Sequence, residues 1–309
     1  MNITVGVDGG QSLIRLRVSG DSDVKSSPGV SHLESPTAAT VAEIVAGLLN
    51  GRVERISRMV AGLTTIPATA DERLSLATRL AEATGAQEVW VGGDEVTSHA
   101  GALAGATGVV LSVGTGVACL ALDGASGAHR TFDGAGYLVG DEGGGFWLGR
   151  HGVRAALAAR EGRGPETSLT DAVSAEIGPI EMVAAILHST ARAVDTIAQL
   201  ARLVLAEAAA GDDVAEAILS EAAARLVTTA SAGVHFLSST PEVTVALGGR
   251  LLLEGHNLAE AVTARLEATF PTLKISLAEG TSLDGACALA EWAAPGPYES
   301  LLSIHRSQP

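Results

Sequence analysis

The chain has 309 residues, which suits two domains or two halves of one architecture and allows a large buried interior. Hydrophobic residues make up 47% and aromatic residues only 3%, a soluble globular composition whose core is built from small aliphatic side chains. With 20 Lys and Arg against 35 Asp and Glu, the formal charge of −15 disfavours nucleic acid or an anionic membrane surface as a partner. An anionic substrate would therefore need local backbone donors or a metal ion.

The first part of the chain alternates strands and helices. Two apolar runs, Ile3–Val7 and Leu13–Val18, flank Asp8-Gly9-Gly10-Gln11-Ser12, which is typical of a hairpin with a glycine turn. The next predicted elements are a helix over 36–49, a strand over 58–63, a helix over 70–84, a strand over 88–91 and a helix over 95–104. This order predicts an α/β fold.

After Gly105 the pattern starts again with an apolar strand, a turn of small residues and a second apolar strand. The predicted elements are strands over 109–113, 117–122 and 128–132, helices over 145–160, 180–210 with a break and 214–237, a strand over 243–247, a helix over 258–269, a strand over 273–277 and a helix over 283–292. The two halves therefore begin alike, as an internal echo. The tail over 295–309 contains Pro and Gly, and we expect it to be loosely held.

Cysteine usage and apolar runs indicate the compartment. Cys119 and Cys287 lie in apolar surroundings without CxxC spacing, which predicts reduced, buried thiols and a cytoplasmic protein. The N-terminus enters a strand pattern without the basic and apolar regions of a signal peptide. The longest apolar run, over 109–122, is interrupted by glycines and hydroxyl residues and is too short to span a bilayer. We therefore expect no membrane partner.

Two glycine turns are candidate phosphate loops. The first places Asp8 at the end of a strand before Gly9 and Gly10, whose missing Cβ atoms let backbone N–H groups approach an anion. The second, Ser112-Val113-Gly114-Thr115-Gly116, again joins two strands with a hydroxyl between glycines. A Walker GxxxxGK[ST] motif and a strand followed by GxGxxG are both absent. Two purely structural hairpins remain the alternative.

Two further turns follow predicted strands. Gly248 and Gly249 lead from a strand into a helix, where a phosphate or a flat ring can approach a helix N-terminus. Asp94 follows Gly92-Gly93 at the carboxyl end of another strand, where open α/β sheets bind ligands. We expect Asp94 to be the N-cap of the next helix. A plain turn and a purely structural cap are the alternatives.

These stretches together, and in this order, resemble the BadF/BadG/BcrA/BcrD ATPase family, part of the sugar-kinase, actin and Hsp70 type of ATPase. The family's enzymes include N-acetylglucosamine and glucosamine kinases. The resemblance covers about residues 3–292 and is carried by VGVDGGQS, GGDEVTSHAGALAG, VLSVGTGV, GAGYLVGDEGGGFWLG, VALGGRLL and SLDGACALA. It implies two ribonuclease-H-like domains with an interdomain cleft for ATP, Mg²⁺ and an acceptor.

The resemblance also implies a domain division and residue roles. The N-terminal domain would span 1–105 with the first phosphate loop and the acceptor-binding elements, and the C-terminal domain 106–294, its last helix free to return to the first domain. The implied roles at the nucleotide are Asp8 for the metal, Gly9, Gly10, Gln11 and Ser12 for the first phosphate loop, Gly114, Thr115 and Gly116 for the second, and Gly248 and Gly249 for adenosine. Asp94 is implied to be the catalytic base and to contact the sugar together with Thr64, Thr65, Gly136, Asp141 and His32. A merely solvated histidine is the alternative for His32.

The chain departs from the amino-sugar kinases of this family at three places. They carry an Asn in the loop after the first hairpin, a Ser after the second GTG and a Trp in a GWG element, where this chain has Gly29-Val30-Ser31-His32-Leu33, Val117 and Ala135. The expected function is an ATP-dependent kinase acting on a hydroxyl of an amino sugar, N-acetylglucosamine or glucosamine. We expect a homodimer, and the Ala-rich helices over 180–237 are expected to be core, with a dimer face as the alternative. An ATPase that activates a partner, which would need further cysteines for an iron–sulfur cluster, and a non-catalytic sugar sensor are the alternatives.

Overall fold

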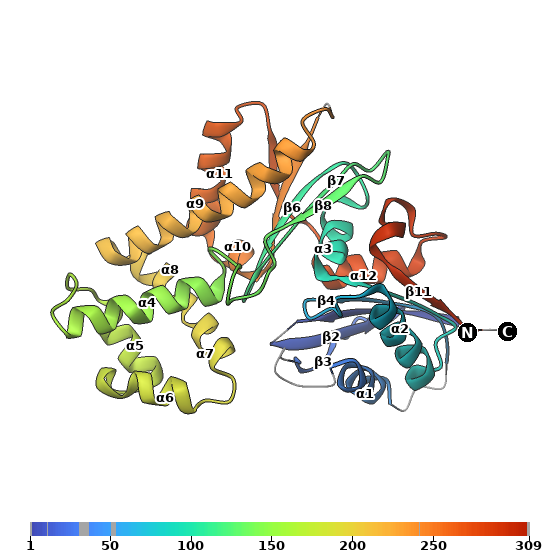
Figure 1. Ribbon diagram of the computed structural model, residues 1–309, viewed down its shortest axis with the longest axis horizontal. Helices are drawn as coiled ribbons and strands as arrows, with labels where there is room; N and C mark the ends of the chain where they lie inside the picture. Colours follow the sequence, from blue (N-terminus) through green and yellow to red (C-terminus); the bar gives the residue numbers. More distant parts are fainter. Residues whose placement is uncertain (1, 11, 31–36, 51–53, 241, 308–309) are drawn as a thin grey trace. The chain divides into compact units, whose positions relative to one another are not determined.

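The computed structural model describes residues 2–10, 12–30, 37–50, 54–240 and 242–307 (Figure 1). Its contacts divide the chain into two compact units. The first unit comprises Met1–Val110, Leu120–Arg130 and Ala278–Pro309, and the second comprises Leu111–Cys119 and Thr131–Leu277. Contact units and ligand-binding domains need not coincide, so the division at 105 and 294 stays a prediction.

The first sheet has six strands in the order β11-β5-β4-β1-β2-β3. Their bounds are β1 (Asn2–Gly9), β2 (Leu13–Val18), β3 (Lys25–Pro28), β4 (Arg55–Leu63), β5 (Glu88–Gly93) and β11 (Ser303–Arg306). Strand β2 runs antiparallel to β1 and β3, whereas β4 runs parallel to β1 and β5. The predicted glycine hairpin between the first two strands is therefore confirmed.

Helices cover both faces of this sheet. They are α1 (Thr37–Leu49), α2 (Ala70–Thr84), α3 (Asp94–Leu103), α12 (Ser282–Glu291) and the 3₁₀ helix η2 (Gly296–Leu301). Successive strand side chains point to opposite faces, so Val89 and Val91 join the core under α1 and α2, while Trp90 joins the core under α3 and α12 (Figure 1). Both faces of the sheet are thus buried, as the apolar strands require.

Local rules set the bounds of α2, which are the predicted ones. The Thr69 hydroxyl accepts the Glu72 N–H, and the Glu72 carboxylate accepts the Thr69 N–H, forming a capping box. At the other end, Gly85 ends the helix with a φ of 72°, in the left-handed region that favours glycine.

The expectation of a loosely held C-terminal tail is wrong for its described part. Strand β11 pairs antiparallel with the edge of β5, and Tyr298 before it is fully buried. The Arg306 guanidinium also contacts the Glu88 carboxylate at 2.9 Å. A four-residue strand supported by distant partners leaves little signal in local sequence, and the same holds for β3.

The second sheet has five strands in the order β10-β9-β6-β7-β8. Their bounds are β6 (Gly108–Val113), β7 (Val117–Leu122), β8 (His129–Phe132), β9 (Thr244–Gly248) and β10 (Lys274–Leu277), with β9 and β10 parallel. Without β11, the first sheet reads β5-β4-β1-β2-β3, which is the same order. The internal echo expected from the sequence is therefore present in the topology.

Helices make up most of the second unit. They are α4 (Gly145–Arg160), α5 (Leu169–Ile177), η1 (Ile180–Met182), α6 (Val183–Ser189), α7 (Ala193–Gln199), α8 (Ala201–Ala209), α9 (Asp213–Phe236), α10 (Arg250–Glu254) and α11 (His256–Thr269). The region 180–210 contains three α-helices rather than one broken helix, and α5 and α10 were not predicted. None of the helices in the described parts of the chain combines the length and apolar character that crossing a bilayer requires.

Candidate functional site

Predicted site residues gather where three parallel strands of the first sheet end. Strand β1 ends at Asp8 and Gly9, β4 leads into Thr64 and Thr65, and β5 is followed by Asp94. The Thr64 N–H donates to the Gly9 carbonyl at 2.9 Å, which joins the ends of β1 and β4. We call this set the first edge, with the members Asp8, Gly9, Gly10, Thr64, Thr65 and Asp94. The carboxyl ends of parallel strands are where α/β sheets bind ligands.

Asp8 is buried, and its carboxylate forms an ion pair with the guanidinium of Arg15. Its Oδ2 accepts hydrogen bonds from Nη2 and Nε of Arg15, at 2.5 and 3.1 Å. Arg15 lies directly opposite Asp8 in the β1–β2 register, and its side chain is 43% exposed. Arg15 was not predicted as a site residue, because it does not belong to a cluster of basic residues. An antiparallel register drawn through the glycine turn would have placed it.

The carboxylate of Asp8 has the chemistry of a magnesium ligand. Arg15 takes Oδ2, which leaves Oδ1 for a cation or its water. Magnesium is commonly held by one or two carboxylates together with substrate phosphates and water. Among the residues that the structure describes, no group of three His, Cys, Asp or Glu side chains forms a resident metal site.

Asp94 is the first residue of α3 and not its N-cap, which corrects the prediction. The N-cap is Gly93, in an extended conformation and without a side-chain cap. The half-buried Asp94 carboxylate instead accepts the Thr64 hydroxyl at 2.5 Å, through Oδ2. The two side chains thus orient each other across the ends of β4 and β5.

The Glu95 carboxylate lies beside Gly93, which precedes Asp94. A Cβ built on Gly93 would lie 2.0 Å from Oε2 of Glu95, so the carboxylate occupies the space that a side chain would need. Burial raises the pKa of Glu95, against a smaller opposite effect of its own backbone N–H. The Glu95 carboxylate therefore lies at the N-terminus of α3, next to Asp94.

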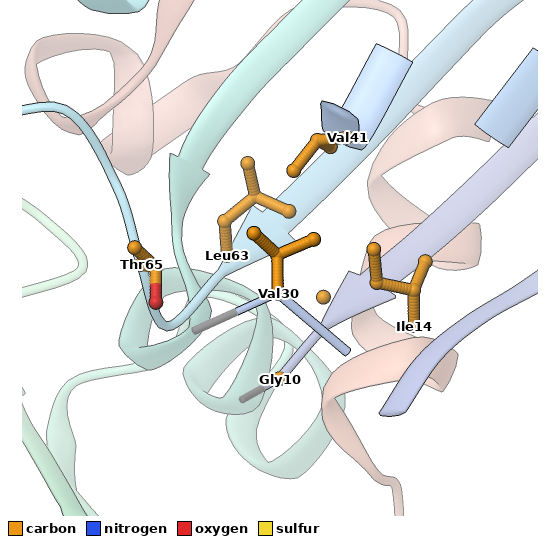
Figure 2. A pocket seen from close by; sticks show the side chains of 7 residues that line it. Gly10, Ile14, Val30, Val41, Leu63 and Thr65 are labelled. Atoms are coloured by element: carbon orange, nitrogen blue, oxygen red, sulfur yellow. The ribbon is translucent and has the colours of Figure 1, made fainter. Parts of the chain in front are cut away.

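A small apolar pocket adjoins the first edge (Figure 2). Its lining residues are Gly9, Gly10, Ile14, Val30, Val41, Leu63 and Thr65. A volume of about 10 Å³ leaves room for roughly one water molecule. The Thr65 hydroxyl is buried and has no hydrogen-bond partner within the described parts of the chain. It is the only side-chain polar group among the described residues that line the pocket.

In the predicted first phosphate loop, one backbone N–H group is used by a hydrogen bond within the turn. The Gly10 N–H donates to the Leu13 carbonyl at 2.8 Å and closes the hairpin. A Cβ on Gly9 would lie 2.4 Å from Cδ2 of Leu63, so this position has no room for a side chain. Ser12 is half-buried in the same turn. Gln11 and His32 lie outside the described residues.

A second set of predicted residues meets at the end of β6. In the turn Gly114-Thr115-Gly116, the Gly114 N–H donates to the Gly116 carbonyl at 2.9 Å. Helix α4 starts against this turn, because Gly145 and Phe146 donate their N–H groups to the carbonyls of Gly114 and Thr115, both at 2.9 Å. We call the second edge the set Gly114, Thr115, Gly116, Gly248 and Gly249.

Gly249 belongs to the second edge for a steric reason. Its φ of 81° favours glycine, and a Cβ there would lie 2.4 Å from the backbone N and O of Val113. The turn after β9, with Gly248 at the strand's end, therefore packs directly on the end of β6.

Asp141 is buried beside the second edge. Its Oδ1 accepts the Val117 N–H at 3.1 Å, and its Oδ2 would lie 2.4 Å from a Cβ on Gly116. Asp141 is also in the left-handed region, with a φ of 58°. Gly136 lies in the preceding loop, where its carbonyl accepts the N–H groups of Val139 and Gly140 at 3.1 and 2.8 Å. The structure thus places Asp141 against a glycine turn.

Asp133 fixes this loop by two hydrogen bonds, and it was not predicted from the sequence as a site residue. Its Oδ1 accepts the Asp141 N–H at 2.7 Å, and its Oδ2 accepts the Glu142 N–H at 3.1 Å. Asp133 has a φ of 55°, which Asp tolerates better than most residues. An Asp before glycine at the end of a strand was the available signal.

The two cysteines are free, as predicted. Cys119 is buried, and its burial together with the nearby negative charge of Asp133 raises the pKa of the thiol to about 12. Cys287 is half-buried rather than buried, because it lies beside the partly exposed Arg17, and burial raises the pKa of its thiol against the opposing charge of Arg17. Both thiols are therefore protonated at neutral pH.

The model of the BadF/BadG/BcrA/BcrD ATPase family matches residues 5–286 of this chain. The chain is also similar to the N-acetylmuramic acid/N-acetylglucosamine kinase of Clostridium acetobutylicum. The two are 26% identical over 305 residues, which cover 94% of this chain and 98% of the relative.

Solved structures share the fold. A provisionally named N-acetylglucosamine kinase of Chromobacterium violaceum superposes with a TM-score of 0.69 at 26% identity, covering 94% of this chain and 99% of that one. One of Porphyromonas gingivalis gives 0.70 at 15% identity, covering 93% and 98%. The ROK hexokinase of Thermus thermophilus gives 0.54 at 17% identity, covering 93% and 97%. These likenesses confirm the predicted fold class, an α/β chain of the actin, hexokinase and Hsp70 type.

Proposed function

Because this chain belongs to the BadF/BadG/BcrA/BcrD ATPase family, we propose that it is an ATP-dependent carbohydrate kinase whose acceptor is an amino sugar. N-acetylglucosamine and glucosamine are the first candidates. The relative from Clostridium acetobutylicum, whose name includes N-acetylglucosamine, supports this class of acceptor. The observation that carries the proposal is the Thr64–Asp94 hydrogen bond at the first edge.

Asp94 is the proposed general base. A sugar hydroxyl is a weak nucleophile at neutral pH, so a carboxylate must orient it and accept its proton as it attacks the γ-phosphate. The Thr64 hydroxyl holds one carboxylate oxygen of Asp94 at 2.5 Å and fixes the direction of the other. Asp94 is the first residue of α3, at the positive end of the helix dipole.

The first edge is also the proposed site for the metal. Asp8 would hold Mg²⁺ through Oδ1, and the bound ion would spread the charge that develops on the phosphates. Arg15 forms an ion pair with the buried Asp8 carboxylate and adds a positive charge to a protein with a formal charge of −15. An acidic chain can thus accept a phosphate here without a Lys-containing loop.

The second edge is the proposed nucleotide site. Thr115 occupies the middle of its glycine turn, where its hydroxyl adds a donor to those of the backbone. The N–H groups of Gly10 and Gly114 close their own turns. The two glycine turns, with Gly9, Gly10 and Ser12 in the first and Gly114, Thr115 and Gly116 in the second, are the proposed phosphate loops. Gly248 and Gly249 are the proposed contact for adenosine.

Thr64, Thr65, Gly136 and Asp141 are the proposed sugar-binding residues, together with His32. Thr65 supports this role best, because its buried hydroxyl has no protein partner among the described residues. A homodimer and a cytoplasmic location complete the proposal.

The test is ADP release by the purified protein with ATP, Mg²⁺ and a panel of sugars. The panel contains N-acetylglucosamine, glucosamine, N-acetylmannosamine, N-acetylmuramic acid and glucose, and mass spectrometry identifies the phosphorylated product. We expect at least one amino sugar to stimulate ADP release. Sugar binding by calorimetry without turnover would instead identify a sensor, and turnover independent of every sugar would identify an ATPase.

A further inference from the structure

A single carboxylate closes the loop between β8 and α4. Asp133 stands at the start of this loop and accepts the backbone N–H groups of Asp141 and Glu142, one with each oxygen, at 2.7 and 3.1 Å. Two successive N–H groups that converge on one anion form a nest, and the anion in this nest is a side chain of the same loop. The contact ties the two ends of the loop together.

We propose that Asp133 is a positioning residue for Asp141, and that it sets the direction of the Asp141 carboxylate during phosphoryl transfer. The proposal rests on the proposed function, in which Asp141 contacts the acceptor sugar. It adds a residue that neither the sequence motifs nor the family resemblance marked.

The backbone of Asp141 depends on this support. Its φ of 58° is a conformation that non-glycine residues adopt at a cost of roughly 1 kcal/mol or more. Hydrogen bonds to an ionised acceptor are stronger than neutral ones, so the Asp133 carboxylate can offset that cost. Gly140 leaves the space for it, because a Cβ there would lie 2.6 Å from Oδ1 of Asp133.

The Asp141 side chain connects the Asp133 contact to the second glycine turn. With its backbone fixed, its Oδ1 reaches the Val117 N–H at 3.1 Å, at the first residue of β7. Its Oδ2 lies over Gly116, where a Cβ would be 2.4 Å away. One contact therefore joins Asp133 to Asp141, and two more join the Asp141 carboxylate to Val117 and to the second glycine turn.

The test compares three variants in the full chain. Asp133→Gly removes both hydrogen bonds and suits the positive φ, so it adds no backbone strain. Asp133→Asn keeps one acceptor oxygen for the Asp141 N–H and loses the other. Asp123→Gly is the matched control, since Asp123 also caps a loop, accepting the Ala125 N–H at 3.0 Å, but has no contact with Asp141.

Kinetics test the link to Asp141. We expect Asp133→Gly to lower kcat/KM for the acceptor about 10- to 100-fold, the range for groups that orient a site residue, and Asp133→Asn to recover part of this. In an Asp141→Asn background, Asp133→Gly should change kcat/KM by no more than about twofold, because the group it positions is gone. Asp123→Gly should leave the kinetics unchanged. Multiplying effects in the double variant, or a single-variant change within twofold, would overturn the proposal.

Hydrogen exchange without ligands separates this proposal from the proposed function. We expect the Asp141 and Glu142 amides to exchange at least about tenfold faster in Asp133→Gly than in the wild type, while Asp123→Gly leaves them unchanged. Unchanged exchange in Asp133→Gly would overturn the positioning role. A wild type that phosphorylates no sugar but shows the expected exchange would contradict the proposed function alone.

Discussion

The two sheets share one strand order and use their acidic residues in opposite ways. At the first edge, the carboxylates of Asp8 and Asp94 pair with the side chains of Arg15 and Thr64. Beside the second edge, carboxylates accept backbone N–H groups. Asp133 accepts those of Asp141 and Glu142, and Asp141 accepts that of Val117.

The kind of partner decides what a carboxylate can do. A side-chain partner can turn away when a substrate arrives, so a carboxylate held in this way can exchange it for a proton or a cation. A backbone partner is fixed by the fold, so it holds the carboxylate in one direction. Under the proposed function, the same topology thus provides a reactive edge in one sheet and a braced turn in the other.

The largest expected effect comes from the reactive edge. Asp94→Asn should lower kcat for the sugar-dependent reaction about 10²- to 10⁴-fold, because the amide cannot accept the acceptor's proton. The free energy of unfolding should change by less than about 1 kcal/mol, since Asn can still accept the Thr64 hydroxyl. Steady-state ADP release and denaturant unfolding measure the two quantities.

Thr64→Val is the control for Asp94→Asn. It keeps the base and removes the hydroxyl that orients it, which is also a proposed sugar contact, so we expect a smaller loss, of about tenfold in kcat. An Asp94→Asn variant with more than a tenth of the wild-type kcat would contradict the difference between the two edges.

A backbone change should break the second edge. Gly249→Ala should lower the free energy of unfolding by about 4 kcal/mol, because a Cβ there meets the Val113 backbone at 2.4 Å in a left-handed conformation. Gly211→Ala has a similar φ of 89° and open space around it, and we expect a cost of about 1 kcal/mol. Equal costs in urea unfolding would show that the packing on β6 is unimportant.

The helix that carries Asp94 should make the protein sensitive to acid. Burial lowers the pKa of His99 to about 4, and its Nδ1 lies 2.8 Å from the Tyr298 hydroxyl. Between pH 6.5 and 4 the unfolded state binds a proton that the folded state does not, so the free energy of unfolding decreases as the pH decreases through this range. The loss should approach about 3 kcal/mol at pH 4 and stay constant below it.

His99→Gln provides the comparison for this pH effect. The variant lacks the titrating ring, so its free energy of unfolding should fall less steeply between pH 6.5 and 4 than that of the wild type. Parallel curves for the two proteins would show that His99 does not carry the effect.

The smallest expected effect is a gain in stability at the first edge. Thr65→Val removes a buried hydroxyl that lacks a partner in the described residues, which should stabilise the fold by up to about 1 kcal/mol. If this hydroxyl binds the acceptor, the KM for the sugar should rise at the same time while the KM for ATP stays unchanged. A variant that is stabilised with an unchanged KM would assign the hydroxyl no role in binding.

Strong local signals made most of the fold predictable from the sequence. The capping box at Thr69 and the left-handed Gly85 fixed α2, and apolar runs around glycine turns located β1, β2, β6 and β7. The short strands β3 and β11 have few apolar residues of their own and depend on distant partners. Such elements are set by tertiary contacts, which local sequence does not contain.

The site was predictable where strands end and less so where side chains pair across the chain. Asp8 lies at the end of a strand, and Thr64 and Asp94 follow strands, so their approximate positions were clear. Arg15 depends on the register of a hairpin, and Asp133 depends on the fold of a long glycine loop. The interpretation of Asp94 as an N-cap was wrong because Gly93 takes that position and frees the carboxylate for Thr64.

The C-terminal strand has a consequence for the synthesis of the protein. The first unit draws on three separate stretches of the chain, and its last stretch supplies both β11 and the helix α12. Until that stretch leaves the ribosome, the face of the first sheet that contains Trp90 lacks the cover of Leu289 and Tyr298. A nascent chain that stalls before this point would expose an apolar face to chaperones and proteases. The unit that the ribosome begins first is therefore completed only after the second unit has been made.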